Sequence, residues 1–298
     1  MTLRIDPRVA DALGSGGAIV ALESTIFSHL GLPSPSNAAA LHGCLAAIRD
    51  HGATPSITAV IDGVERVGLA DAEHPLILGP ARKAAERDLS VAVGQRWPVG
   101  ATTVSASVAL AARAGVKVFA TGGIGGVHRS AEQTGDISAD LGAIARHPVV
   151  TVSAGAKAFL DLPRTLEHLE MLGVPVIGFE CDEFPAFTVR SSGLPLAHHT
   201  TDVAELARIA RAQLASGTGM LVVTPVPADV ALSADELNAA IGAALASTHS
   251  AGITGAAVTP HVLTAIAAAT KGDAVRANIA LACNNADLAA RLAVALAE

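Results

Sequence analysis

The stretch GATTVSASVALAARAGVKVFATGGIGGVHR, Gly100–Arg129, decides the fold. An Ala-rich segment with helical spacing, Val104–Gly115, leads directly into a short apolar run, Val116–Gly123, and then into a turn crowded with glycines. A short apolar run bounded by glycine is typical of a buried strand. Helix, buried strand and glycine turn in this order form one unit of an α/β fold.

The same alternation continues on both sides of this unit. Apolar runs predict strands in GAIVALES, PSITAVID, PVVTVSAG, VPVIGFE and GMLVVTP. Helical spacing predicts helices over Ser36–His51, Ala139–Arg146, Thr165–Leu172, Val203–Ser216, Ser233–Ala246, Pro260–Thr270 and Arg276–Leu296. The pattern predicts a layered αβα fold with a central, mainly parallel sheet. We expect one domain over residues 1–298, because the Pro-rich passage 224–230 looks like a loop and not a linker.

Composition narrows the class of protein. The 298 residues suffice for a sizeable core, and with no Tyr and 2% aromatic residues that core must be built from Ala, Val, Ile and Leu. A net charge of −7 without a basic stripe argues against nucleic acid as a partner. Three distant cysteines indicate neither a disulfide framework nor a zinc site. Without an apolar leader or an uninterrupted apolar run of 18 residues, we expect no membrane association and a cytoplasmic protein.

In parallel sheets, ligands bind beyond the carboxyl ends of the strands. Polar residues gather at four such predicted ends, namely ALESTIFSH, ATGGIGGVHR, VSAGAKAF and VVTPVP. Glu23 ends the first of these strands. A carboxylate there is either held in a structural salt bridge or functional, and burial would raise its pKa and suit it to donating a proton.

Lys157 follows another of these strands, in a chain that contains only four lysines. Unlike arginine, a lysine in an apolar pocket can lose its proton and attack a carbonyl-like carbon. The alternative, a surface lysine at a helix start, is disfavoured by the helix dipole. We therefore favour a nucleophilic role for Lys157.

Three further patterns leave alternatives open. The glycine-rich turn Thr121–Arg129 fits anion or sugar binding as well as tight packing. Hydroxyl residues from Thr102 to Ser107 fit a phosphate cradle at a helix start as well as ordinary capping. Asp136 and Asp140, four residues apart, would share a helical face and could hold a divalent cation, but Asp136 or Ser138 also fits an N-cap. His128, Asn284 and Asn285 indicate no function by themselves.

In sequence order, these segments resemble the pseudouridine-5′-phosphate glycosidase family, also called the indigoidine synthase A family. The resemblance rests on ALEST, RKAAERDL, the opening stretch, DISADL, VSAGAKAFLDLP, LGVPVIGFECDEFPAF, the TP of AAVTPHVL and NIALACNNA, from about residue 20 to 290. It implies an enzyme that reversibly hydrolyses the C–C glycosidic bond of pseudouridine 5′-phosphate to uracil and ribose 5-phosphate. It also implies a divalent cation, typically Mn²⁺, and a homotrimer.

The resemblance also implies roles for individual residues. Glu23 matches the general acid, Lys157 the nucleophile and Asp136 the metal ligand. The positions that match substrate-binding residues are Lys83, Val104, His128, Ser138, Ala139, Asp140 and one of Asn284 or Asn285. The implied mechanism traps C1′ of the opened ribose as a Schiff base on Lys157.

The sequence departs from the family pattern at several positions. The loop SHLGLPSPSN carries one extra residue, and Glu180, Cys181, Thr224 and Ala256 replace the usual residues. These departures leave two alternatives: a C-glycosyl synthase that joins ribose 5-phosphate to an aromatic natural product, and an inactive homologue that binds sugar phosphates. The presence of Glu23, Asp136 and Lys157 together argues against the second alternative.

Overall fold

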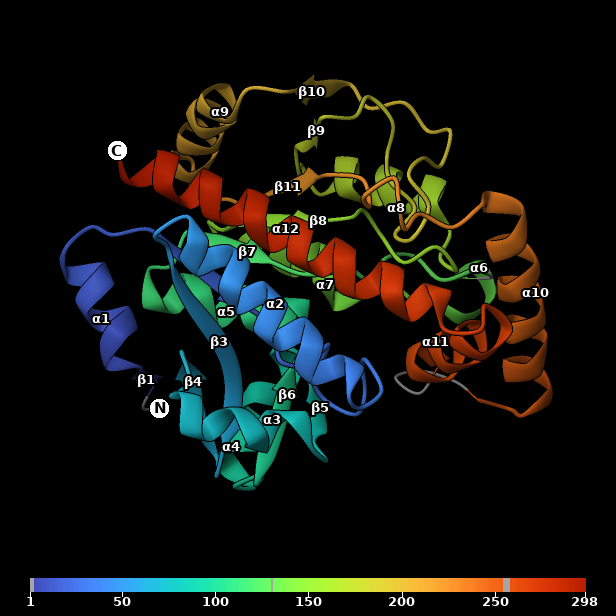
Figure 1. Ribbon diagram of the computed structural model, residues 1–298, viewed down its shortest axis with the longest axis horizontal. Coiled ribbons are helices and arrows are strands. Elements are labelled where there is room, and N and C mark those ends of the chain that lie inside the picture. The colour runs from blue at the N-terminus through green and yellow to red at the C-terminus, as the bar shows by residue number, and fades with distance from the viewer. Residues whose placement is uncertain (1–2, 130, 254–257) are drawn as a thin grey trace.

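The computed structural model describes residues 3–129, 131–253 and 258–298. Its centre is a sheet in which the described residues form eleven strands, and helices cover both faces (Figure 1). The predicted αβα architecture with a mainly parallel sheet is therefore confirmed.

The parallel part of the sheet has the order β3-β2-β7-β8-β11-β9-β10. Consecutive parallel strands require crossover connections, and helices provide most of them. The strands of this part are β2 (Ile19–Leu22), β3 (Thr54–Ile61), β7 (Val118–Ala120), β8 (Val150–Ser153), β9 (Val176–Phe179), β10 (His198–Thr200) and β11 (Met220–Val223).

The long strand β3 links this parallel part to a smaller antiparallel part. Its first half, Thr54–Ile57, pairs with β2 in parallel, while its second half, Thr58–Ile61, pairs with β4 and β6 in antiparallel fashion. The remaining strands are β1 (Arg4–Ile5), β4 (Val64–Val67), β5 (Arg82–Ala84) and β6 (Val99–Thr102). The sequence analysis did not predict these four short strands or β10.

Two helical layers enclose the sheet. Helices α2, α9 and α12 cover one face, where α12 runs alongside α2 (Figure 1), and α5, α7 and α8 cover the other. The helices are α1 (Pro7–Gly14), α2 (Ser36–Asp50), α3 (His74–Leu78), α4 (Leu89–Gly94), α5 (Val104–Ala114), α6 (Ala131–Thr134), α7 (Ala139–Arg146), α8 (Leu162–Met171), α9 (Val203–Ala215), α10 (Ala234–Ser250), α11 (Val258–Ala269) and α12 (Asp273–Ala297).

The pleat of the strands divides the apolar residues between two cores. On β2, Val20 and Leu22 join the core beneath α2 and α12, while Ile19 and Ala21 join the core beneath α5. Successive side chains on a strand point to opposite faces, so a strand covered on both faces must be apolar throughout. This explains why the strands appear in the sequence as continuous apolar runs.

Helix α12 is long and apolar enough to cross a membrane by length and composition alone. Half of its most apolar segment is buried inside the protein, however, and it packs on α2, α9 and the strands β2, β7 and β8. These contacts are those of a core helix.

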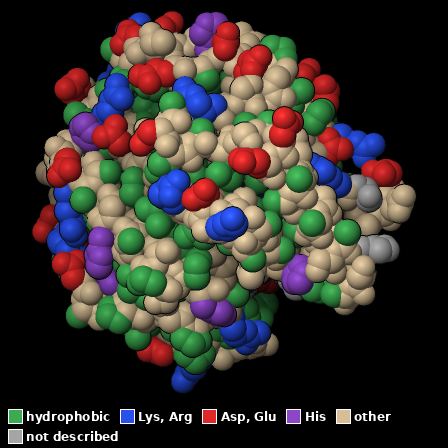
Figure 2. Space-filling view, turned by 45° about the vertical axis from the view of Figure 1, so that its right-hand side comes forward, with side chains coloured by type: hydrophobic (Ala, Val, Ile, Leu, Met, Phe, Trp, Pro, Cys, Tyr) green, Lys and Arg blue, Asp and Glu red, His purple; other side chains and the backbone are tan. Residues whose placement is uncertain are grey.

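Over the face shown in Figure 2, positive and negative side chains are interspersed.

The predicted helices are present with small shifts at their ends. The largest shift is at α10, which ends at Ser250, four residues after the predicted end. Helix α8 starts at Leu162, three residues before the predicted start, because Asp161 caps it and Pro163 occupies its first turn. Ala256, one of the departures from the family pattern, lies outside the described residues.

Candidate active site

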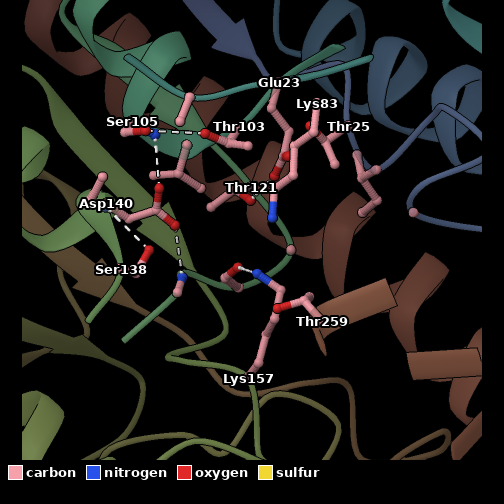
Figure 3. Close-up of a pocket in the computed structure, with 18 of the residues that line it drawn as sticks. Glu23, Thr25, Lys83, Thr103, Ser105, Thr121, Ser138, Asp140, Lys157 and Thr259 are labelled. Atoms are coloured by element: carbon pink, nitrogen blue, oxygen red, sulfur yellow. Dashed lines mark hydrogen bonds between the residues drawn. The ribbon is translucent and has the colours of Figure 1, made fainter. Parts of the chain in front are cut away.

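The largest cavity, about 430 Å³, opens at the carboxyl ends of β2, β7 and β8. These three strands are neighbours in the order β2-β7-β8, so the residues that follow them converge. Glu23 follows β2, Thr121 follows β7, and Lys157 lies four residues beyond β8. Figure 3 shows Glu23 and Lys83 entering the cavity from one side and Lys157 from the opposite side.

Glu23 is 8% exposed and accepts a hydrogen bond from the Thr121 hydroxyl. Burial raises the pKa of Glu23, against the opposing effects of the Lys157 charge and the Thr121 hydrogen bond. Among the described residues it has no ion-pair partner. The structural salt bridge that the sequence left open is therefore not formed, and Glu23 can hold a proton at a higher pH than an exposed glutamate.

Lys157 is anchored by its own strand exit. Its Nζ donates a hydrogen bond of 2.8 Å to the carbonyl of Gly123, and its backbone N–H donates to Ile124. The amine therefore stands over the glycine turn that follows β7, inside the cavity, with its position fixed by a neutral acceptor. Among the described residues, Lys157 takes part in no ion pair, and its amine faces the cavity.

Lys83 brings a second amine to the cavity from a distant part of the chain. It lies on β5, which pairs with β6 on the antiparallel side of the sheet. Burial lowers the pKa of Lys83, and the nearby Lys157 charge lowers it further. Two lysines facing one cavity disfavour each other's charge unless an anion lies between them.

Asp140 holds the N-terminus of α5 against the glycine turn. Its Oδ1 accepts from the Ser105 N–H at 3.0 Å and its Oδ2 from the Gly125 N–H at 2.9 Å (Figure 3). An α5 amide that was predicted to help cradle a phosphate is therefore already occupied by a carboxylate. Ser105 and Thr103 still face the cavity with their hydroxyls, which lie 3.1 Å apart.

Asp136 and Asp140 do not share a helical face, because α7 begins only at Ala139. Ser138 is the N-cap of α7 and accepts from the Asp140 N–H at 3.2 Å, so the capping alternative is confirmed. Asp136 instead lies on the preceding segment, where its carboxylate is 3.7 Å from His128 Nδ1. Burial lowers the pKa of His128 despite this neighbour.

The glycines of this region allow other segments of the protein to pack closely against the backbone. A Cβ on Gly155 would lie 1.9 Å from the Pro185 carbonyl oxygen, and this glycine has a φ of +75°. A Cβ on Gly125 would lie 2.3 Å from the Ser138 hydroxyl. The tight-packing alternative for the glycine-rich turn therefore applies here: these glycines let distant loops approach so closely that the site can form.

The predicted site residues mostly gather in this cavity. Its wall includes Glu23, Lys83, Val104, His128, Asp136, Ser138, Ala139, Asp140 and Lys157. Asn284 and Asn285 are not part of it. The Asn285 amide is buried behind the wall and donates to the carbonyls of Thr121 and Gly122, while Asn284 reaches towards Pro225 at 3.5 Å.

Sequence reasoning missed Asn278, which does line the cavity. It stands seven residues before Asn285 on α12, so both side chains point from the same face of the helix. Asn278 is 9% exposed, and its Oδ1 has no hydrogen-bond partner among the residues that the structure describes. The asparagine repeated at this spacing, in NIALACNN, was the available signal.

The departures from the family pattern lie away from this cavity, with one exception. Glu180, Cys181 and Thr224 are not in its wall, and burial raises the pKa of Cys181 to about 11, so this thiol is not poised to react. The loop with the extra residue is the exception, because Leu30 and Gly31 line the cavity.

Comparison with known proteins identifies close relatives along the full length of the chain. A family model described as indigoidine synthase A like protein matches residues 8–295. A protein of Myxococcus xanthus (strain DK1622) named pseudouridine-5′-phosphate glycosidase is 49% identical over 303 residues, covering 100% of this chain and 99% of the relative. A protein of the same name from Chloroflexus aurantiacus (strain ATCC 29364 / DSM 637 / Y-400-fl) is 48% identical, with 99% of both chains covered.

Two solved structures have the same fold. The prealnumycin C-glycosynthase AlnA, in complex with ribulose 5-phosphate, is 34% identical, with a TM-score of 0.90 over 100% of this chain and 97% of its own. An indigoidine synthase A-like protein from Thermotoga maritima is 29% identical, with a TM-score of 0.89 and the same coverage.

Proposed function

This chain belongs to the indigoidine synthase A-like family, and we propose that it is a pseudouridine-5′-phosphate glycosidase. It would reversibly hydrolyse the C–C glycosidic bond of pseudouridine 5′-phosphate to uracil and ribose 5-phosphate. One observation carries the proposal: the Lys157 amine and the Glu23 carboxyl group face one cavity from neighbouring strand ends. Full-length relatives that bear this name support it.

The bond to be broken explains the need for a lysine. A C–C glycosidic bond has no heteroatom on the leaving group to protonate, so a pair of carboxylates does not suffice. A lysine amine can instead bond to C1′ and later act as an electron source. The cavity offers this amine together with the Glu23 carboxyl group, whose pKa is raised by burial, and neither of them is in an ion pair among the described residues.

The reaction would proceed by ring opening and a Schiff base. The proton of Glu23 goes to the ring oxygen O4′ as the C1′–O4′ bond opens, and the Lys157 amine bonds to C1′. The Lys157 nitrogen, now bonded to C1′, gives a proton to the Glu23 carboxylate, which passes it to uracil C5. The nitrogen lone pair then expels uracil, which leaves C1′ as an imine of Lys157. Water hydrolyses this imine to release ribose 5-phosphate and the free amine.

The buried cations of the cavity would hold the phosphate. Lys83 has a lowered pKa because it is buried and lies near Lys157, so an incoming dianion relieves the repulsion between the two amines. The hydroxyls of Thr103 and Ser105 at the start of α5 are hydrogen-bonded to each other and line the same cavity, so one of them can donate to the phosphate. Asp140, which is engaged by two backbone amides, would keep this helix start in place.

We also propose a divalent cation, Mn²⁺, at Asp136. Among the described residues no group of three or more His, Cys, Asp and Glu side chains is arranged to hold a metal ion. The donors present, the Asp136 carboxylate with the His128 ring nearby, instead fit an ion that keeps waters and binds substrate phosphate. When bound, the ion would supply positive charge to the phosphate. Asp136→Asn should abolish Mn²⁺ binding, measured by calorimetry without substrate.

The assembly and compartment of the protein are carried over from the family resemblance. We propose a homotrimer in the cytoplasm. Sedimentation velocity of the purified full-length chain measures the oligomeric state. Fractionation of cells that express the protein measures its compartment. A monomer at micromolar concentration would contradict the trimer.

The test of the activity uses the reverse reaction. Uracil and ribose 5-phosphate with Mn²⁺ should yield pseudouridine 5′-phosphate, and borohydride should trap a ribose phosphate adduct on Lys157, located by peptide mass spectrometry. Lys157→Arg should abolish turnover, because a guanidinium cannot form the imine. Lys117→Arg, an exposed lysine far from the cavity, is the matched control. Full activity without any adduct on Lys157 would exclude the Schiff base.

One observation favours a second candidate function. The structural neighbour that is a C-glycosynthase binds ribulose 5-phosphate on the same fold at 34% identity. A synthase of this kind would join ribose 5-phosphate to an aromatic ring other than uracil. Product from such a ring, but none from uracil, would replace the glycosidase proposal with this one.

A further inference from the structure

A second cavity of about 150 Å³ opens beside the catalytic one. The two share five wall residues, Gly31, Phe159, Phe187, Leu263 and Asn278. We call the smaller cavity the side pocket. Its wall beyond the shared residues is mainly apolar and comes from the loop after β2, from α10, α11 and the start of α12, and it includes Leu32, Leu237, Ile266, Ala267, Ala274 and Val275.

Charge distinguishes the shared wall from the rest of the catalytic cavity. The charged side chains Lys83, Arg87, Asp136, Asp140 and Lys157 line only the catalytic cavity. The five shared residues carry no charge. A substrate with a phosphate at one end must place that end among the cations, which leaves its uncharged end at the shared wall.

Phe187 connects this wall to Lys157 through Gly123. Its ring packs on Gly123, where a Cβ would lie 2.6 Å from Phe187 Cδ2, and the Gly123 carbonyl accepts from Lys157. The backbone of Phe187 has a φ of +61°, which is rare for an aromatic residue, and its N–H is bonded to Ala154 at 2.9 Å. Such strain persists where surrounding contacts enforce it, and it clusters at ligand sites.

Asn278 adds an acceptor to the same wall. Its Oδ1 is buried and, within the described part of the chain, has no hydrogen-bond partner, although Asn278 lines both cavities. A buried unpaired amide oxygen costs stability unless a ligand donor completes it. A planar ring with an N–H or O–H group on its near edge would supply this donor.

We propose that the side pocket receives a second ring of the aglycone, so that the enzyme accepts fused two-ring aromatic aglycones as well as uracil. The proposal rests on the proposed function, because it places the aglycone beside C1′ on Lys157. A cavity of about 150 Å³ lined by Leu, Ile and Phe binds benzene in another protein, so the side pocket has room for about one additional six-membered ring.

The reaction with such an aglycone is balanced without a further reagent. The Lys157 amine condenses with the C1′ aldehyde of ribose 5-phosphate and releases water. An electron-rich ring carbon then bonds to C1′, and its proton passes through Glu23 to the lysine nitrogen. Finally the 4′-hydroxyl replaces this nitrogen at C1′, and the hydroxyl proton leaves with the amine.

The test compares two acceptors that differ only in the second ring. Resorcinol and 1,3-dihydroxynaphthalene each offer a carbon between two hydroxyl groups, and each is supplied with ribose 5-phosphate in parallel with uracil. We expect kcat/KM to be about tenfold or more higher for the naphthalene, as for added apolar contact in a binding pocket. Product is identified by mass and by its stability to acid.

Filling the side pocket should remove this preference. Ala267 and Ala274 line the side pocket and not the catalytic cavity. Ala267→Phe, or Ala274→Leu if the first variant fails to fold, should lower the ratio of naphthalene to resorcinol turnover about tenfold. Ala268→Phe, an exposed neighbour on α11, is the matched control and should keep the ratio.

The outcomes separate the two proposals. Turnover of uracil without the naphthalene, or a ratio unchanged in the filled variants, overturns the side pocket as an aglycone site and leaves the glycosidase in place. Turnover of the naphthalene without uracil, with the ratio lost in the filled variants, keeps the side pocket and overturns the glycosidase. No product from any acceptor overturns both.

Discussion

Two buried glutamates, Glu23 and Glu65, have different roles in this molecule although their side chains are the same. Glu65 is 1% exposed and accepts two hydrogen bonds from the Arg113 guanidinium, at 2.9 and 2.6 Å. The pair joins β4 to α5, and it raises the pKa of Arg113. The Glu65 carboxylate therefore has a cationic partner, and it does not line the catalytic cavity.

Glu23 is also buried, at 8% exposed, but its hydrogen-bond partner among the described residues is neutral, the Thr121 hydroxyl. Burial therefore raises the pKa of Glu23, because no ion pair stabilises its charged form. The comparison teaches that burial alone does not mark a functional carboxylate. What marks it is burial without an ion pair, in the wall of a cavity that a substrate can enter.

Replacing each glutamate by glutamine should separate the two roles. Glu23→Gln keeps the shape and removes the proton, so kcat should fall by about 10²–10⁴-fold, the usual contribution of general acid catalysis. The melting temperature should stay the same or rise, because an amide is easier to bury than a carboxylate. Initial rates with pseudouridine 5′-phosphate and a thermal melt measure both. Unchanged activity would remove Glu23 from the mechanism.

The same substitution at Glu65 should act on stability. Glu65→Gln weakens the bidentate pair and leaves Arg113 without its counter-charge, so unfolding free energy should fall by about 1–3 kcal/mol. Activity per folded molecule should be retained. Urea unfolding followed by circular dichroism measures the loss. A fall in kcat comparable to that of Glu23→Gln would mean that the two regions are not independent.

Removing the one hydrogen bond to Glu23 should shift the pH profile. The Thr121 hydroxyl stabilises the carboxylate and lowers the pKa of Glu23 against the effect of burial. Thr121→Val should therefore raise this pKa further and move the alkaline limb of kcat/KM to higher pH, with a loss in rate of about tenfold. Thr121→Ser restores a hydroxyl and should restore the profile. If the alkaline limb of kcat/KM does not move in Thr121→Val, Glu23 is not the group whose titration produces that limb.

The smallest effect concerns the pH dependence of stability. The folded-state pKa of Glu23 is above its unfolded value, so the protonated form favours the folded state. Its contribution is present below the ordinary glutamate pKa of about 4.3 and is lost as the pH rises through the raised folded value. Unfolding free energies of wild type and Glu23→Gln, measured from pH 4 to 8, should diverge in favour of the variant as the pH rises. Parallel curves would contradict a raised pKa.

The parallel strands and the residues at their ends were predictable, because both depend on local sequence. A buried strand must be apolar on both faces, and a polar residue at its carboxyl end is therefore conspicuous, as for Glu23 and Lys157. The short strands β4, β5 and β6 were not predictable in the same way. Each is three or four residues long. Strands β4 and β6 pair with the second half of β3, and β5 pairs in turn with β6.

The site features that escaped prediction depend on contacts between distant segments. Asn278 and Asn285 share a face of α12, and two helical turns, about 10 Å, separate them. The sequence does not determine the position of α12 along its own axis relative to the sheet. It therefore could not predict which of the two asparagines reaches the cavity. Likewise, nothing near Asp140 reveals that the amides of Ser105 and Gly125 will occupy its oxygens.

The double pairing of β3 has a consequence for local opening. Because its first half belongs to the parallel strands and its second half to β4 and β6, the part of the sheet that carries Lys83 cannot separate from the part that carries Glu23 unless β3 is broken. The amide protons of β3 should accordingly be among the slowest in the molecule to exchange with deuterated solvent, at a rate set by global unfolding. The distance between Lys83 and Lys157 should then be kept for as long as the protein stays folded.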